Sequence, residues 1–168
     1  MLEKRDFYIN GQWVAPQDGT DHHVIDPSTE EPPAVLSLGG ATAAEAAIAA
    51  AKAAFPAWMA TPVEERIALV EKLIDSYQTR VEDLAQAMAA ELGAPLDMAR
   101  SQQVGAGTWH LKNFIRAAKS FDFIKPLGDH APNDRIIHEP VGVAALITPW
   151  NWPMNQVTLK VGAAAIAG

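Results

Sequence analysis

The stretch that decides the fold is residues 141–168, VGVAALITPWNWPMNQVTLKVGAAAIAG. Its apolar run, residues 143–147, has the composition of a central strand in a sheet covered on both faces. Pro153 suits the first position of a helix, because a proline lacks the N–H that would have no partner there. We therefore expect a buried strand, a stiff turn over residues 148–153, and a helix. In open α/β sheets, ligands bind at the carboxyl ends of such strands.

Bulk composition narrows the class of protein. The formal net charge of −7 argues against a nucleic-acid binder, which would present a basic face. The longest apolar runs carry charged residues, which argues against a membrane span, and no basic run beside an apolar helix suggests membrane-surface binding. The first residues lack the apolar core of a signal peptide, so we expect a cytoplasmic protein. The sequence has no cysteine, which excludes a disulfide or a cysteine nucleophile from these 168 residues.

The first forty residues predict short strands. Asn10-Gly11 between the apolar and aromatic runs of residues 7–14 is typical of a tight hairpin. Residues 22–25 and 35–38 predict two further short strands, each closed by turn-forming residues.

The middle of the chain predicts helices. Thr42 with Glu45, and Thr61 with Glu64, have the spacing of capping boxes that open a helix ending near Phe55 and a second helix. Gly93 marks the end of a third helix, and residues 97–119 predict a fourth. The expected core positions are Ile67, Val70, Ile74, Tyr77, Val81, Leu84, Met88, Leu92, Trp109, Phe114 and Ile115.

The number of predicted strands is too small for a complete doubly wound sheet. Residues 121–125 and 135–139 predict a hairpin that could reach a partner. Only residues 143–147 predict a central strand, so we expect the sheet to be incomplete and the chain to be the front part of a longer protein.

Asn151 carries the sharpest functional hypothesis. Its amide could donate to an oxygen that becomes negative during a reaction, and the helix N-terminus beside it favours the same charge. From the residues alone a helix-capping role for Asn151 is favoured, because asparagine is a common cap. Trp150 and Trp152 could line a pocket or anchor a core, and Lys160, which shares a helix face with Gln156, either reaches solvent or serves a site. The five histidines are not spaced as metal ligands, so we predict no metal site.

The run EPVGV at residues 139–143 followed by ITPWNWP at residues 147–153 resembles the aldehyde dehydrogenase superfamily. The hairpin YINGQW at residues 8–13, DPST at residues 26–29 and FPAW at residues 55–58 are similar to the same family. One departure is Ala94, which stands where the family usually has a lysine.

The resemblance implies oxidation of a small aldehyde to an acid with NAD or NADP, NAD being favoured. In that family a cysteine thiolate attacks the aldehyde and a glutamate activates water. The implied fold is α/β: the N-terminal part of a Rossmann-like coenzyme-binding domain with a protruding oligomerisation hairpin. The implied full-length assembly is a homodimer or homotetramer.

The resemblance also assigns site residues. Asn151 matches the oxyanion-hole asparagine, and Ile147, Thr148, Pro149 and Trp150 join it at the coenzyme cleft. Trp152, Gln156, Leu159 and Lys160 match walls of the substrate tunnel. Val24, Ile25 and Glu91 match positions that hold a monovalent cation in some members, a weak match to which we attach no metal.

By the same resemblance, residues 1–120 belong to the coenzyme-binding domain, residues 121–139 form half of the oligomerisation arm, and residues 140–168 add the first core strand and helix. The catalytic domain, with the cysteine and the glutamate, lies beyond residue 168. We expect the 168-residue chain alone to be inactive. The alternative is a non-catalytic remnant that binds an intact dehydrogenase subunit.

Overall fold

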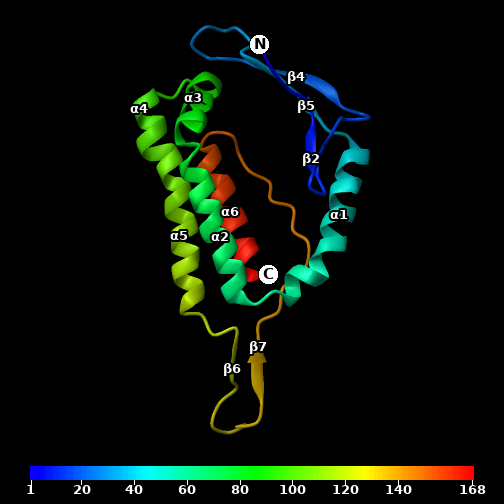
Figure 1. Cartoon of the computed structure of the whole chain (residues 1–168), viewed down its shortest axis with the longest axis vertical. Helices are drawn as coiled ribbons and strands as arrows, with labels where there is room; N and C mark the ends of the chain where they lie inside the picture. Colours follow the sequence, from blue (N-terminus) through cyan, green and yellow to red (C-terminus); the bar gives the residue numbers. More distant parts are fainter.

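A computed structural model describes all of residues 1–168 as an open frame of helices with a small sheet at one end and a projecting arm at the other (Figure 1). Mixed α/β composition with incomplete sheets confirms the predicted fold class. The strands are β1 (Leu2–Lys4), β2 (Phe7–Ile9), β3 (Gln12–Val14), β4 (Thr20–Val24), β5 (Ala34–Leu38), β6 (Ile124–Pro126) and β7 (Arg135–Ile137). The helices are α1 (Ala41–Ala60), α2 (Val63–Gln78), α3 (Val81–Leu92), α4 (Leu96–Met98), a π-helical turn (Ala99–Val104), α5 (Gly105–Lys119) and α6 (Pro153–Ala167).

The core lies in one layer made by α2, α5 and α6. The predicted stripe on α2 is confirmed, since all four of its residues are buried. The prediction that Trp109 belongs to the core is wrong, because its side chain is 63% exposed. The layer's buried cluster is Ile67, Val70, Ile74, Leu111, Ile115, Ala118 and Ile166, and a second cluster beside α3 is Tyr77, Ala85, Met88, Ala99 and Val104.

Two glycines let α5 approach its neighbours. A Cβ on Gly107 would lie 2.3 Å from Oη of Tyr77, and a Cβ on Gly162 of α6 would lie 2.9 Å from Cδ2 of Leu111. Tyr77 Oη donates a 2.8 Å hydrogen bond to the Val104 carbonyl at the end of the π-helical turn. Gly107 and Gly162 therefore serve close packing, whereas a Cβ on Gly105 would meet no other atom within 4 Å.

Neither predicted capping box forms. Helix α1 begins at Ala41, and its Thr42 N–H donates at 3.1 Å to the carboxylate of Asp18, whose pKa this bond lowers. The helix also continues through Pro56 to Ala60 rather than ending near Phe55. Thr61 Oγ1 donates to the Ala57 carbonyl instead of capping α2. A loop residue distant in sequence has thus replaced the local cap at α1.

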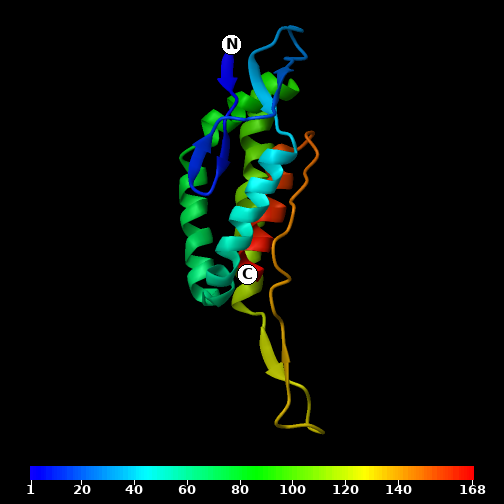
Figure 2. The ribbon, with the colours of Figure 1, turned by 90° about the vertical axis from the view of Figure 1, so that its right-hand side faces the viewer.

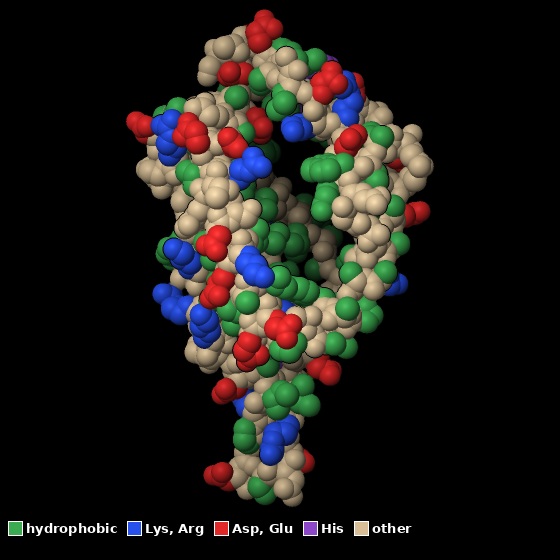
Figure 3. Space-filling view, viewed as in Figure 1, with side chains coloured by type: hydrophobic (Ala, Val, Ile, Leu, Met, Phe, Trp, Pro, Cys, Tyr) green, Lys and Arg blue, Asp and Glu red, His purple; other side chains and the backbone are tan.

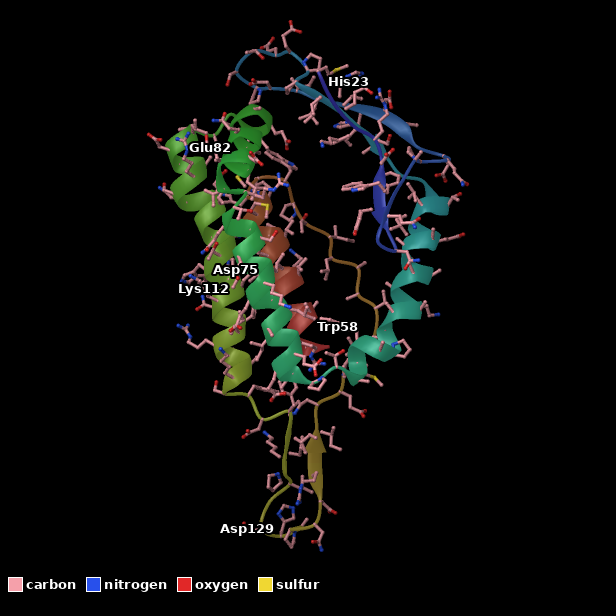
Figure 4. All side chains as sticks on the ribbon, in the orientation of Figure 1. His23, Trp58, Asp75, Glu82, Lys112 and Asp129 are labelled. Carbon is pink, nitrogen blue, oxygen red and sulfur yellow. The ribbon has the colours of Figure 1, made fainter.

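The strands form three separate small sheets. β5 lies between β1 and β4, and β6 pairs with β7 to form the arm, with Asp129 at its tip (Figure 4). The Asn10-Gly11 hairpin joins β2 to β3 as predicted, with φ of 51° and 78° at its two turn residues. Those positive values fit the twist of a two-residue hairpin turn.

The predicted buried strand over residues 143–147 does not form. Residues 140–151 make no backbone hydrogen bond within the chain, and they run alongside the helices without joining a sheet (Figure 2). Val143 is 44% exposed and Ile147 is 83% exposed. The physical reason is that no other strand lies beside this segment to accept or donate hydrogen bonds.

The segment crosses a hollow between α1 and the helical layer, and hydrophobic side chains line this hollow (Figure 3). A cleft of about 300 Å³ there is bounded by Phe55 and Trp58 of α1, by residues 142–144 and by the end of α6. Only 19 of the 168 residues are buried; both hydrophobic clusters lie within the elements from α2 to α6, and α1 contributes no buried residue. None of the helices is both long enough and apolar enough to cross a membrane.

Because Tyr77 is buried, we expect the chain to lose stability at high pH. Burial raises the pKa of Tyr77 from 10.0 to about 12. Between these values the unfolded chain releases the phenol proton and the folded chain keeps it, so the contribution is complete below pH 10 and is lost as the pH rises toward 12. We expect the free energy of unfolding to fall by about 2 kcal/mol over this range.

The measurement is urea unfolding at a series of pH values, with Tyr77→Phe as the control. The phenylalanine variant should be less stable at pH 8, because it leaves the Val104 carbonyl without its donor. It should also lose less stability between pH 10 and pH 12 than the parent chain. Parallel curves for the two proteins would contradict the assignment.

Candidate active site

Helix α6 begins without a side-chain cap. Trp152 occupies the N-cap position, Pro153 is the first helical residue, and no side chain accepts a hydrogen bond from the first turn. Asn151 is exposed and its amide makes no hydrogen bond within the chain. The capping role that the residues alone favoured for Asn151 is therefore wrong. Its amide is free to donate beside a helix N-terminus, where the dipole favours negative charge.

The four other predicted coenzyme positions lie together in the exposed segment before α6. Ile147 and Trp150 are 83% and 78% exposed, and Thr148 and Pro149 are exposed between them. The backbone C=O groups of all four residues, and the N–H groups of Ile147, Thr148 and Trp150, have no partner in the chain. The segment thus offers main-chain donors, main-chain acceptors and an indole surface on one side of the hollow.

The predicted substrate positions share one face of α6. Trp152, Gln156 and Lys160 are half-buried, and Lys160 Nζ donates to Gln156 Oε1 at 3.1 Å. Leu159, beside them, is 37% exposed. The residues of α6 that pack on the helical layer are instead Thr158, Gly162 and Ile166.

One contact at the start of α6 was missed by sequence reasoning. Nε2 of His110 on α5 lies 2.7 Å from Oδ1 of Asn155 in the first turn of α6. The two residues are separated by 45 positions, and neither belongs to a motif with a defined spacing. Only the packing of α5 against α6 brings them together.

The residues that match a cation site in some family members include only one carboxylate, that of Glu91. No three His, Cys, Asp or Glu side chains come close enough to hold a metal ion together. Burial raises the pKa of Glu91, which disfavours the charged form that a cation would need. Ile25 is half exposed on the loop that follows β4.

Similarity to known proteins identifies the family of this chain. The sequence profile described as "Aldehyde dehydrogenase family" matches residues 13–168. This chain belongs to the aldehyde dehydrogenase family. The match includes the exposed segment, the turn with Asn151 and the whole of α6.

Relatives and solved structures agree with the family assignment. The 3-succinoylsemialdehyde-pyridine dehydrogenase of a Pseudomonas species is 38% identical over 169 residues, which cover 100% of this chain and 35% of that protein. The crystal structure of aldehyde dehydrogenase from Bartonella henselae has 49% identity and a TM-score of 0.96, covering 99% of this chain and 35% of its own. Aldehyde dehydrogenase C from Pseudomonas syringae, a mutant complexed with NAD+ and octanal, has 38% identity and a TM-score of 0.91, covering 97% and 33%.

These relatives are much longer than the chain. The 168 residues span about a third of the length of the proteins they match, and they correspond to the N-terminal portion of those proteins. The high TM-scores show that the open frame is the arrangement that this portion has in complete enzymes.

Because Asn151 makes no capping hydrogen bond, we expect its substitution to leave the stability of the chain unchanged. Asn151→Ala should leave the melting temperature of the chain unchanged, because no intrachain hydrogen bond is lost. Asp18→Ala should lower it, because the Thr42 N–H loses its acceptor. Thermal unfolding followed by circular dichroism compares the two. A clear destabilisation by Asn151→Ala would restore the capping role.

Proposed function

We propose that this chain provides one wall of the active site of an NAD(P)-dependent aldehyde dehydrogenase that oxidises a small aldehyde to a carboxylic acid. The observation that carries the proposal is the free amide of Asn151 at the uncapped start of α6. In the reaction, a cysteine thiolate adds to the aldehyde and the carbonyl oxygen becomes negatively charged. Asn151 donates a hydrogen bond to that oxygen, aided by the dipole of α6.

The nucleophile must come from outside these residues, because the chain has no cysteine. The same holds for the glutamate that activates water in our proposal. The role of this chain is therefore to bind and orient the aldehyde and to stabilise the oxyanion. Trp152, Gln156, Leu159 and Lys160 form its side of the aldehyde site.

The exposed segment before α6 suits coenzyme binding, because its backbone groups are free to make hydrogen bonds. Ile147, Thr148, Pro149 and Trp150 have no backbone partner, so they can bind the hydroxyl groups of a ribose. Bound NAD or NADP supplies the hydride acceptor of the oxidation. Solved relatives include complexes with NAD+ and an enzyme described as NADP-dependent. We favour NAD, and we propose a cytoplasmic homodimer or homotetramer for the complete enzyme.

A hybrid enzyme tests the proposal. Residues 1–168 replace the matching N-terminal third of the Bartonella henselae aldehyde dehydrogenase, to which they are 49% identical. We expect the hybrid to reduce NAD or NADP with a short aldehyde, and the 168-residue chain alone to show no turnover. A folded but inactive hybrid would contradict the proposal, and so would turnover by the isolated chain.

Asn151→Ala in the hybrid tests the catalytic role itself. Loss of one oxyanion donor should lower kcat by about a hundredfold or more. The measurement is the steady-state rate of NAD(P)H formation, with circular dichroism to confirm that the fold is intact. Because the amide makes no structural bond, a fall in kcat without a fall in melting temperature is the expected pattern. An unchanged rate of the chemical step would remove Asn151 from this role.

A second candidate is a non-catalytic binding function. The arm of β6 and β7 projects away from the helices and exposes Ile124, Leu127 and Ile137 at 64%, 43% and 58% (Figure 1). Such a hairpin could dock onto an intact dehydrogenase subunit. Sedimentation of the 168-residue chain with and without the full-length Bartonella enzyme discriminates. A complex that Ile124→Lys abolishes would favour this candidate, and the absence of a complex would exclude it for this partner.

A further inference from the structure

We propose that His110 is a positioning residue, which holds the first turn of α6, and thereby the amide of Asn151, in its productive orientation. This inference rests on the proposed function for its catalytic consequence. His110 touches neither aldehyde nor coenzyme in this proposal. It acts through Asn155.

The contact is a directional hydrogen bond. Nε2 of His110 lies 2.7 Å from Oδ1 of Asn155, and both side chains are half-buried. An amide oxygen only accepts, so in this arrangement the imidazole donates from Nε2, in the tautomer that carries its proton there. The ring centroids of His110 and Trp109 lie 5.0 Å apart, and the two ring planes meet at an angle of 75°. The neighbouring indole therefore limits the directions in which the imidazole can turn.

The hydrogen bond between His110 and Asn155 can orient α6 because it links the first turn of α6 to α5. It is the only side-chain hydrogen bond that joins α6 to another element of the chain. The rest of this interface is apolar contact through Gly107, Leu111 and Gly162, which permits small sliding and rotation. A hydrogen bond has a preferred direction, so it restricts the rotation of the first turn about the axis of α6.

That rotation matters because nothing else holds Asn151. The segment before it has no backbone hydrogen bond, and the start of α6 has no side-chain cap. Asn155 lies four residues after Asn151, across the restricted Trp152-Pro153 junction. The orientation of the first turn is therefore the main constraint on the direction of the Asn151 amide.

Two substitutions separate the hydrogen bond from the ring. His110→Phe keeps an aromatic ring beside Trp109 but has no donor, whereas His110→Gln places an amide donor near the position of Nε2. In an active hybrid enzyme we expect His110→Phe to lower kcat by about ten- to a hundredfold, with the KM for aldehyde unchanged, because oxyanion stabilisation acts in the transition state. His110→Gln should restore most of the lost rate.

Controls distinguish positioning from a general loss of stability. Thr158→Val removes a 2.6 Å hydrogen bond within α6, from Thr158 Oγ1 to the Met154 carbonyl, without touching the His110 link. Whatever its effect on the melting temperature, it should leave kcat unchanged. Asn155→Leu should reproduce the effect of His110→Phe, and the double variant should be no slower than either single variant.

A second readout does not depend on activity. In the 168-residue chain, the side-chain amide resonances of Asn151 should move in His110→Phe and return toward their original positions in His110→Gln. If the parent hybrid is inactive, the proposed function fails and this spectrum alone decides the inference. Unchanged kcat in the His110→Phe hybrid, or unchanged Asn151 resonances in the His110→Phe chain, would overturn it.

Discussion

The close approach of α5 and α6 is the constraint on which the rest of the structure depends. Gly162 leaves room for Leu111 and Phe114 of α5, and Gly107 leaves room for Tyr77 of α2 and, less tightly, for Thr158 of α6. Leu111, which is fully buried, fills the space between α5 and α6. This packing sets the position of α6, and the contact of His110 with Asn155 limits its remaining rotation, so the turn that precedes α6 has a defined place. Asn151 lies in that turn, and its amide is free because no side chain caps the start of α6.

Signals that are local in sequence predicted the structure well. Pro153 opens α6, Gly93 ends α3 with φ of 67°, and Asn10-Gly11 turns the first hairpin. Each of these residues acts through its own backbone preference, which the sequence states directly. The capping predictions failed because several oxygen acceptors compete for the free N–H groups at the start of a helix. The N–H of Thr42 donates to Asp18, which lies 24 residues earlier and reaches the helix only in the folded chain.

Burial was harder to predict than secondary structure. Trp109 has the spacing of a core residue on α5, but no neighbouring element covers it, and it stays 63% exposed. Residues 143–147 have the composition of a central strand, but a strand also needs partners for its backbone groups. The contact of His110 with Asn155 had no sequence signal at all, because it depends on how two helices pack. Of the candidate site, the family motif therefore predicted the turn and the face of α6, and the structure added the contact between α5 and α6 beside them.

The exposure of the site explains why this chain alone should not catalyse, even apart from its lack of cysteine. A hydrogen bond to a developing oxyanion is valuable when water is excluded, since charge interactions weaken strongly in a medium of high dielectric constant. Trp150 is 78% exposed and Asn151 faces solvent at the edge of the hollow. Strands that paired with residues 143–147 would satisfy the free backbone and also cover this region. In our proposal, strands that complete the sheet would also exclude water from the oxyanion site, so a thiol supplied in solution would not by itself make the 168-residue chain an efficient dehydrogenase.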